Sequence, residues 1–188
     1  MVRKPKCIIV AGRPGSGKNT IANKLARALW MPLVSRDEIK EGYVNTFDVR
    51  HDELGPDANA NATNLFFEIV DQYLQRNISI VIEAAFQHKV WEPRVQKIVG
   101  SASPFIILCS IDDAVAARRY LERGLADARR EYFHGDNMVV HYRKTGQIVP
   151  FADFIPPKFD IPTLEVWTDG EYVPSVDEIV KWIGTPTA

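Results

Sequence analysis

The stretch that most restricts how this chain can fold is residues 12–20, which read GRPGSGKNT. Apolar residues precede it at 7–11, and apolar residues at helical spacing follow it at 21–29. A strand, a loop of the pattern G-x-x-x-x-G-K and a helix build a phosphate site, because glycine lets successive N–H groups turn inward and the helix start adds donors. We therefore predict a nucleoside triphosphate at this loop. The predicted ligands are Gly12, Arg13, Pro14, Gly15, Ser16, Gly17, Lys18, Asn19 and Thr20.

The residue after Lys18 departs from that pattern. A Ser or Thr hydroxyl usually stands there and contacts Mg²⁺, whereas here Asn19 follows the lysine and Thr20 follows Asn19. An asparagine carbonyl oxygen is also a hard ligand of the kind that Mg²⁺ accepts. We predict ATP and Mg²⁺ at this loop, with Lys18 as a cation for the outer phosphates and with Asn19 or Thr20 at the metal.

Length and composition restrict the class of protein. With 188 residues, 46% of them hydrophobic, the chain suits a single domain, 1–188, with a proper core. A net charge of −1 argues against a general nucleic-acid coat and against binding to anionic membranes. No apolar run approaches the roughly 18 residues of a membrane span. Cys7 and Cys109 lie in apolar runs, so we expect two buried free thiols in the reducing cytoplasm. The sequence leaves a monomer or a homodimer open.

Apolar runs alternate with segments of helical periodicity along the chain. The pattern predicts strands at 7–11, 32–34, 78–82, 105–109 and 164–167. It predicts helices at 21–29, 36–44, 65–74, 91–99 and 113–123 and after Ser175, a polar loop at 48–64 and an irregular connection at 150–162. Capping boxes are predicted for Ser35 with Glu38, Ser110 with Asp113 and Ser175 with Glu178. This alternation indicates an α/β fold with a parallel sheet that helices cover on both faces.

Charged residues follow the second predicted strand, at the edge of the sheet where ligands of such folds bind. Asp37 could accept the proton of an acceptor hydroxyl, while Arg36 and Lys40 hold an anionic substrate or the transferring phosphoryl group. The alternative is a charged helix start without a catalytic role.

Glu83 ends the third predicted strand, at the same edge of the sheet. Its carboxylate has three functional interpretations: a holder of Mg²⁺ through water, a substrate ligand, or a second candidate base. The alternative is a solvated strand end.

Five arginines lie close together in the second half of the chain: Arg118, Arg119, Arg123, Arg129 and Arg130. They could belong to a lid over residues 118–136 that neutralises charge during phosphoryl transfer, with Gly124 and Gly135 allowing it to move. Arg119 and Arg123 share a helix face and are the catalytic candidates. The alternative is a solvated charged face.

The loop, the segment Ser35-Arg36-Asp37-x-x-Lys40, the segment from Val81 to Phe86 and the arginine helix together resemble the small P-loop kinases. The loop is similar to that of adenylate-kinase-like proteins. The resemblance is nearest to the kinase domain of polynucleotide kinase and to AAA-type, zeta-toxin-like kinases. It implies a three-layer fold with a five-stranded parallel sheet of order 2-3-1-4-5 and a mobile lid. It also implies Asp37 as the base and Lys40 as an acceptor-phosphate ligand. That second position is more often arginine in the group, which weakens a nucleic-acid acceptor.

We therefore predict an ATP-dependent phosphotransferase that acts on a hydroxyl of a small molecule, with acceptor-binding helices over about 36–76. Its acceptor pocket would lie between the helices at 36–44 and 65–74. Tyr43, Phe47, Phe66 and Phe67 could contribute walls, although we expect most of them in the core. One alternative is a polynucleotide 5′-hydroxyl or nucleotide kinase. The other is a nucleotide-binding regulatory or toxin-like module with little turnover, which Asn19 keeps open.

Overall fold

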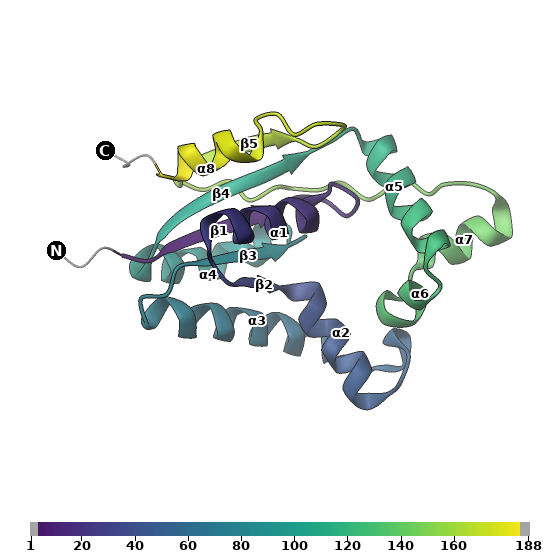
Figure 1. Ribbon diagram of the computed structural model, residues 1–188. Coiled ribbons are helices and arrows are strands. Elements are labelled where there is room, and N and C mark those ends of the chain that lie inside the picture. Colours follow the sequence, from purple (N-terminus) through teal and green to yellow (C-terminus); the bar gives the residue numbers. More distant parts are fainter. Residues whose placement is uncertain (1–3, 185–188) are drawn as a thin grey trace.

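A parallel sheet forms the centre of the computed structural model, which describes residues 4–184 (Figure 1). Its strands are β1 (Lys6–Ala11), β2 (Leu33–Ser35), β3 (Ile80–Ala84), β4 (Ser103–Ser110) and β5 (Thr163–Trp167). They pair in the order β2-β3-β1-β4-β5, and every pair is parallel. The order that the family resemblance implied is confirmed. Runs of branched apolar residues form the inner strands because both faces of a parallel sheet are covered.

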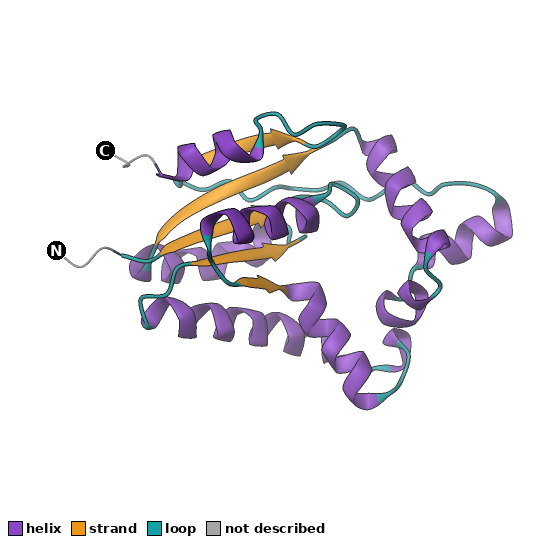
Figure 2. Ribbon diagram, viewed as in Figure 1, coloured by secondary structure: helices purple, strands orange, loops and turns teal. Residues whose placement is uncertain are grey.

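Helices cover both faces of the sheet and give the fold three layers (Figure 2). On one face, α1 (Lys18–Leu29) and α8 (Val176–Gly184) pack against Ile8 and Val10 of β1. On the other, α3 (Ala58–Gln75) and α4 (His88–Ser101) pack against Cys7 and Ile9. Alternate β1 residues therefore serve opposite cores, as the period of a strand requires.

The remaining helices extend beyond the carboxyl end of the sheet (Figure 1). They are α2 (Arg36–Phe47), the short 3-10 turn η1 (His51–Glu53), α5 (Asp113–Ala126), α6 (Arg129–His134) and α7 (Asn137–Thr145). A small cluster that includes Leu121 and Val139 fixes α7 on α5. Residues 146–162 then return to β5 without regular structure, which includes the irregular connection predicted at 150–162.

Several predicted boundaries were wrong. The loop predicted at 48–64 contains η1 and the first turns of α3, which already begins at Ala58. Alternating Ala and Asn residues conceal this helix, because their polar side stays exposed while Ala62 is buried. Strand β3 is displaced toward the carboxyl end and runs to Ala84, so Glu83 lies inside the strand rather than at its end.

Two of the three predicted capping boxes were wrong. Asp112 caps α5 by accepting from the amides of Ala114 and Val115, at 2.9 and 3.1 Å. Ser35 precedes α2 but makes no side-chain cap. Only the third box forms, where the Ser175 amide donates to Glu178 and the Glu178 amide donates to Ser175 Oγ.

The two cysteines are buried and free, as predicted, and burial raises both thiol pKa values to about 12. Among the helices within residues 4–184, none has the length and apolar character needed to cross a membrane.

Candidate active site

The loop between β1 and α1 is a cradle of backbone donors. Gly15 and Gly17 have positive φ angles of 80° and 77°, which side chains other than glycine rarely adopt. A Cβ at Gly15 would also lie 2.2 Å from the Ala116 carbonyl oxygen of α5. Helix α1 has no side-chain cap and no acidic residue in its first turn, so no side chain competes for its first amides. Such an N-terminus suits an anion.

Beneath this loop, Lys18 meets a buried carboxylate. Lys18 Nζ lies 3.5 Å from Glu83 Oε1, and the Ser35 hydroxyl donates to Glu83 Oε2 at 2.8 Å. The register brings these groups together, because Glu83 pairs with Val10 of β1 and with Ser35 of β2. Glu83 is 1% exposed, and burial raises its pKa, while Lys18 opposes this shift. The interpretation of Glu83 as a solvated strand end was therefore wrong.

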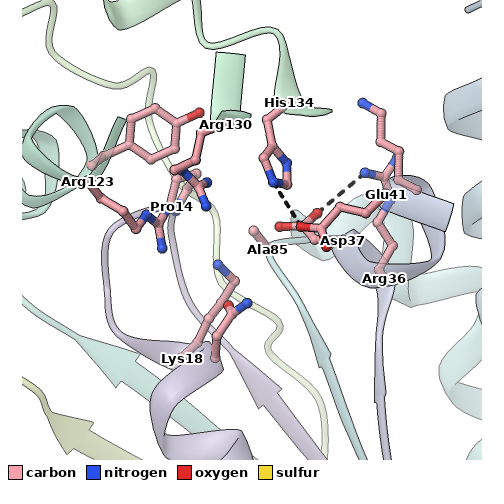
Figure 3. A pocket seen from close by; sticks show the side chains of 12 residues that line it. Pro14, Lys18, Arg36, Asp37, Glu41, Ala85, Arg123, Arg130 and His134 are labelled. Atoms are coloured by element: carbon pink, nitrogen blue, oxygen red, sulfur yellow. Dashed lines mark ion pairs between the residues drawn. The ribbon is translucent and has the colours of Figure 1, made fainter. Parts of the chain in front are cut away.

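A polar pocket of about 220 Å³ opens beside the loop at the carboxyl edge of the sheet (Figure 3). Figure 3 shows Arg123 and Arg130 across the pocket from Asp37 and Glu41, with Lys18 at the bottom. The structure thus brings together many of the predicted site residues, which come from three separate segments. The lining residues are Pro14, Lys18, Asn19, Arg36, Asp37, Lys40, Glu41, Ala85, Tyr120, Arg123, Arg130 and His134.

A second pocket, of about 300 Å³, has a different set of loop residues in its wall. Arg123 is common to both pockets. Thr168 joins this pocket to the loop, because its hydroxyl donates to the Ser16 carbonyl oxygen at 2.7 Å. The lining residues are Gly15, Gly17, Thr20, Arg119, Arg123, Thr168, Gly170 and Tyr172.

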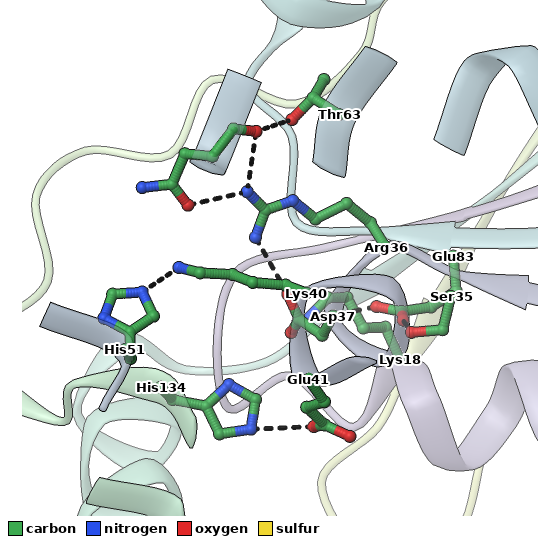
Figure 4. A network of polar contacts seen from close by, with 11 residues as sticks. Lys18, Ser35, Arg36, Asp37, Lys40, Glu41, His51, Thr63, Glu83 and His134 are labelled. Atoms are coloured by element: carbon green, nitrogen blue, oxygen red, sulfur yellow. Dashed lines mark hydrogen bonds and ion pairs between the residues drawn. The ribbon is translucent and has the colours of Figure 1, made fainter. Parts of the chain in front are cut away.

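The charged residues at the start of α2 are held by neighbours that the sequence reasoning missed (Figure 4). The Arg36 guanidinium donates to the backbone and side-chain oxygens of Asn59 and lies 3.5 Å from the Asp37 carboxylate. Lys40 is 8% exposed and contacts Nε2 of His51. Burial, followed by repulsion from Arg36, lowers the pKa of Lys40 to about 8.

The arginine cluster divides between different environments. Arg119 donates to the Thr168 carbonyl oxygen at 3.0 Å and to the Asp169 carboxylate at 2.8 Å, so it lines the second pocket and not the first. Arg123 and Arg130 line the pocket that contains Asp37. Arg129 is 82% exposed and paired with Asp127, and Arg118 is exposed. Helical spacing grouped Arg119 with Arg123 but gave no reason to single out Arg130.

The lid segment contacts the acceptor-side helix directly. His134 Nε2 of α6 lies 2.9 Å from Glu41 Oε1 of α2, and both side chains line the pocket. Neither residue was predicted for the site. Glu41 lies one helical turn after Asp37, so its position on the same face was detectable. His134 carried no such signal, because only the tertiary fold brings α6 to α2.

The two lid glycines are packing residues in this structure. A Cβ at Gly124 would lie 2.5 Å from Val139 Cγ2 and 2.8 Å from Asp136 Oδ2. Gly135 has a φ angle of 61°, and a Cβ there would lie 2.6 Å from His51 Nδ1. Close approach therefore explains both glycines without the hinge role that the sequence suggested.

The predicted aromatic walls lie outside the polar pocket. Phe66 and Phe67 are buried in the core against Phe86 and Trp91, as expected for most of these residues. Tyr43 and Phe47 instead line a separate hollow near the end of α2. The pocket beside Asp37 is thus polar, and its walls come from the loop, α2 and the lid.

The oxygen atoms near Lys18 fit a magnesium ion that arrives with a triphosphate. Mg²⁺ in such sites takes one or two protein oxygens and completes its shell with phosphates and water. Glu83 Oε1 is buried without a hydrogen-bond donor, and Asn19 lines the pocket next to Lys18. Thr20 lines the other pocket. Within residues 4–184 no group of three or more His, Cys, Asp or Glu side chains could hold a metal ion alone.

Comparison with known proteins gives one family and several solved structures. The model of a family described as "AAA domain" matches residues 7–138. No curated protein matches the chain. A "putative kinase" from Chloroflexus aurantiacus J-10-fl is 26% identical with a TM-score of 0.76, covering 98% of this chain and 96% of that one.

Two more distant structures share the fold. A gluconokinase from Sinorhizobium meliloti 1021 is 17% identical, with a TM-score of 0.52, and covers 97% of this chain and 91% of that one. The Mycobacterium tuberculosis APS kinase, solved with AMPPNP and APS, is 14% identical with a TM-score of 0.61 and covers 98% and 100%.

Proposed function

The chain belongs to the AAA domain family, and we propose that it is an ATP-dependent phosphotransferase that moves the γ-phosphoryl group to a hydroxyl of a small molecule. Its fold is the P-loop NTPase kinase fold, with the strand order 2-3-1-4-5. The observation that carries the proposal is the single pocket in which Lys18 of the loop and Asp37 of α2 face Arg123 and Arg130. Phosphoryl transfer needs such positioned cations and a group that accepts the hydroxyl proton.

The triphosphate would extend along the loop between the two pockets. The nucleoside would occupy the pocket beside Arg119, Thr168 and Tyr172, because the other pocket contains the candidate base. Arg123 borders both pockets, which supports a position near the outer phosphates. Lys18 would exchange part of its contact with Glu83 for those phosphates.

Asp37 is our candidate for the base that orients and deprotonates the acceptor hydroxyl. Its side chain is 42% exposed, so an acceptor in the pocket can reach it. Arg36 and Lys40 would hold an anionic group of the acceptor or the transferring phosphoryl group. Asn19 and Glu83 would hold Mg²⁺, which when bound offsets the charge on the β- and γ-phosphates. The pocket volume of about 220 Å³ supports a small acceptor.

The first test is transfer of the labelled γ-phosphoryl group from ATP–Mg²⁺ to pooled sugars, nucleosides, aminoglycosides and 5′-hydroxyl oligonucleotides. Asp37→Asn should lower transfer at least about a hundredfold while ATP still binds. Glu38→Gln is the matched control, because Glu38 is the exposed neighbour on the same helix and does not line the pocket. Equal transfer by wild type and Asp37→Asn would remove Asp37 as the base.

Asn19 favours a second candidate, a nucleotide-binding regulatory or toxin-like module with little turnover. An amide in place of the usual hydroxyl could bind nucleotide and still transfer poorly. A large gain of Mg²⁺-dependent turnover in Asn19→Ser would support the module. Tight ATP binding without transfer to any pool would support it as well. The nucleic-acid alternative predicts a steep salt dependence of oligonucleotide binding.

A further inference from the structure

Asp136 is a buried carboxylate that the proposed chemistry does not use. It lies between α6 and α7 and is 1% exposed. Its backbone carbonyl oxygen accepts from the amide of Val139 at 3.0 Å, but its side chain makes no cap on α7. Within the described residues 4–184 no donor meets hydrogen-bond geometry at either carboxylate oxygen, although the Tyr120 hydroxyl interacts with this carboxylate. A buried carboxylate without hydrogen bonds is costly, so its position needs an explanation.

The carboxylate faces the two arginines of the polar pocket. Asp136 Oδ2 lies 4.0 Å from Nε of Arg130, and that Nε is likewise buried without a hydrogen-bond partner. Desolvation and then the neighbouring Arg130 lower the pKa of Arg123, while Tyr120 and Asp136 oppose this shift. Burial, followed by the charge of Asp136 and by the side-chain interaction of the Tyr120 hydroxyl with that carboxylate, raises the pKa of Tyr120 beyond its usual range. Four ionisable side chains from three lid segments therefore share one cluster.

Helix α5 fixes the carboxylate from the other side. Asp136 Oδ2 would be only 2.8 Å from a Cβ at position 124, so the absence of a side chain at Gly124 lets the carboxylate lie against the helix. Arg123 and Arg130 carry like charges in the same pocket wall, and a carboxylate behind them offsets their repulsion. A shift of about 1 Å would shorten the 4.0 Å separation to a hydrogen bond.

We propose that Asp136 is a positioning residue, which holds Arg130 and its neighbour Arg123 at the pocket wall with their remaining donors toward the triphosphate. It acts through the arginines and touches no substrate. The inference rests on the proposed function for its catalytic meaning. The binding of polyphosphate, by contrast, tests it without any turnover.

The test is a double-mutant cycle on the affinity for inorganic tripolyphosphate, measured by calorimetry on the full chain. Arg130→Gln should weaken binding about tenfold in the wild-type background, because it removes a charge-assisted contact. In the Asp136→Asn background the same change should cost about threefold or less, because Arg130 is no longer held in place. An equal loss in both backgrounds would overturn the proposal, and so would no loss from Arg130→Gln.

The matched control is the cycle of Arg129→Gln with Asp127→Asn. This pair carries the same charges on the same lid, but Arg129 is exposed and does not line the polar pocket. The effects of these two substitutions on the affinity for tripolyphosphate should be additive. Coupling of the same size in the control cycle would mean that any nearby charge pair on the lid has this effect, and it would overturn the proposal.

Kinetics and stability complete the test. Once an acceptor is known, Asp136→Asn should lower kcat about tenfold or more with a smaller change in KM for ATP. Coupling without transfer to any acceptor would leave the inference standing while the proposed function fails. If the Asp136→Asn variant does not fold, Asp136→Ser takes its place in the cycle. Failure of both variants to fold would mean that Asp136 is needed for folding alone and would overturn the proposal.

Discussion

At the scale of single residues, Lys18 has two tasks in this fold. Its loop position makes it a cation for the outer phosphates, and its side chain also balances Glu83, a carboxylate buried in the sheet. The loop motif predicts the first task without tertiary information. The second depends on β3 lying beside β1, and it makes the lysine a contributor to stability as well as to the proposed catalysis.

Lys18→Ala should abolish transfer and also lower the free energy of unfolding by about 3 kcal/mol, because it leaves Glu83 buried without its cation. Burial raises the pKa of Glu83, so the folded state keeps this proton to a higher pH than the unfolded state does. The loss of stability in Lys18→Ala therefore grows as the pH rises through the folded pKa of Glu83, and lowering the pH reverses it. Denaturant unfolding over a series of pH values above the usual pKa of a glutamate measures this effect.

The double variant Lys18→Ala with Glu83→Gln is the control for that prediction. It removes the charge that the lysine balanced and should recover at least half of the lost stability. Unfolding of Lys18→Ala that is independent of pH, with no recovery in the double variant, would mean that the buried pair does not contribute to stability.

Lys40 should make acceptor binding weaken at basic pH. Its pKa of about 8 lies below the usual value, so the folded protein loses this charge as the pH rises through that value. For an acceptor with an anionic group, KM should rise above about pH 8, by up to tenfold per pH unit. The free energy of unfolding should rise over the same pH range, because between the folded and the unfolded pKa of Lys40 the unfolded chain binds more protons.

Steady-state kinetics across this pH range check the prediction. Lys40→Met should have a high KM throughout, without the inflection. Lys89→Met, at an exposed position on α4 outside the pocket, should keep it. An inflection that survives in Lys40→Met would assign the titration to another group.

At the scale of elements, the lid packs closely on its neighbours. Helix α7 lies on α5 at Gly124, and α6 meets α2 through His134 and Glu41. The 118–136 segment was predicted as a lid from its arginines and glycines. Helices α5 and α6 do contribute residues to the pocket wall, but the glycines of the segment allow close contact between helices. Mobility of this segment remains a prediction.

Gly124→Ala should destabilise the protein by about 1–3 kcal/mol, because the methyl group overlaps Val139 and Asp136. Gly42→Ala is the matched control in the exposed interior of α2, where a Cβ meets nothing within 4 Å. It should stabilise by about 0.5–1 kcal/mol, since alanine favours helix. Thermal unfolding of the two variants measures both changes, an expected loss of stability for Gly124→Ala and an expected gain for Gly42→Ala. Higher stability in both variants would mean that Val139 and Asp136 move to accommodate the added methyl group and that the prediction for Gly124 is wrong.

At the scale of the whole molecule, the site lies where the sheet, α2 and the lid meet, so ligand binding and stability are linked. At about a hundred times its Kd, ATP should stabilise the fold by about 2.7 kcal/mol. For a chain of this length this corresponds to a rise in Tm of about 5–10 °C. Scanning calorimetry with ATP–Mg²⁺ measures the shift. An equal shift in Lys18→Ala would assign ATP binding to another place.

The sequence by itself determined the local parts of this protein: the inner strands, the loop with its lysine, and the parallel sheet with α2 at its edge. These depend on runs of apolar residues and on fixed spacings, which neighbouring residues encode. The tertiary structure alone decided that Glu83 is buried between Ser35 and Lys18, that Arg123 lines both pockets while Arg119 lines only the second, and that His134 meets Glu41. Such contacts join residues far apart in the chain, and their register and crossing geometry leave no local pattern.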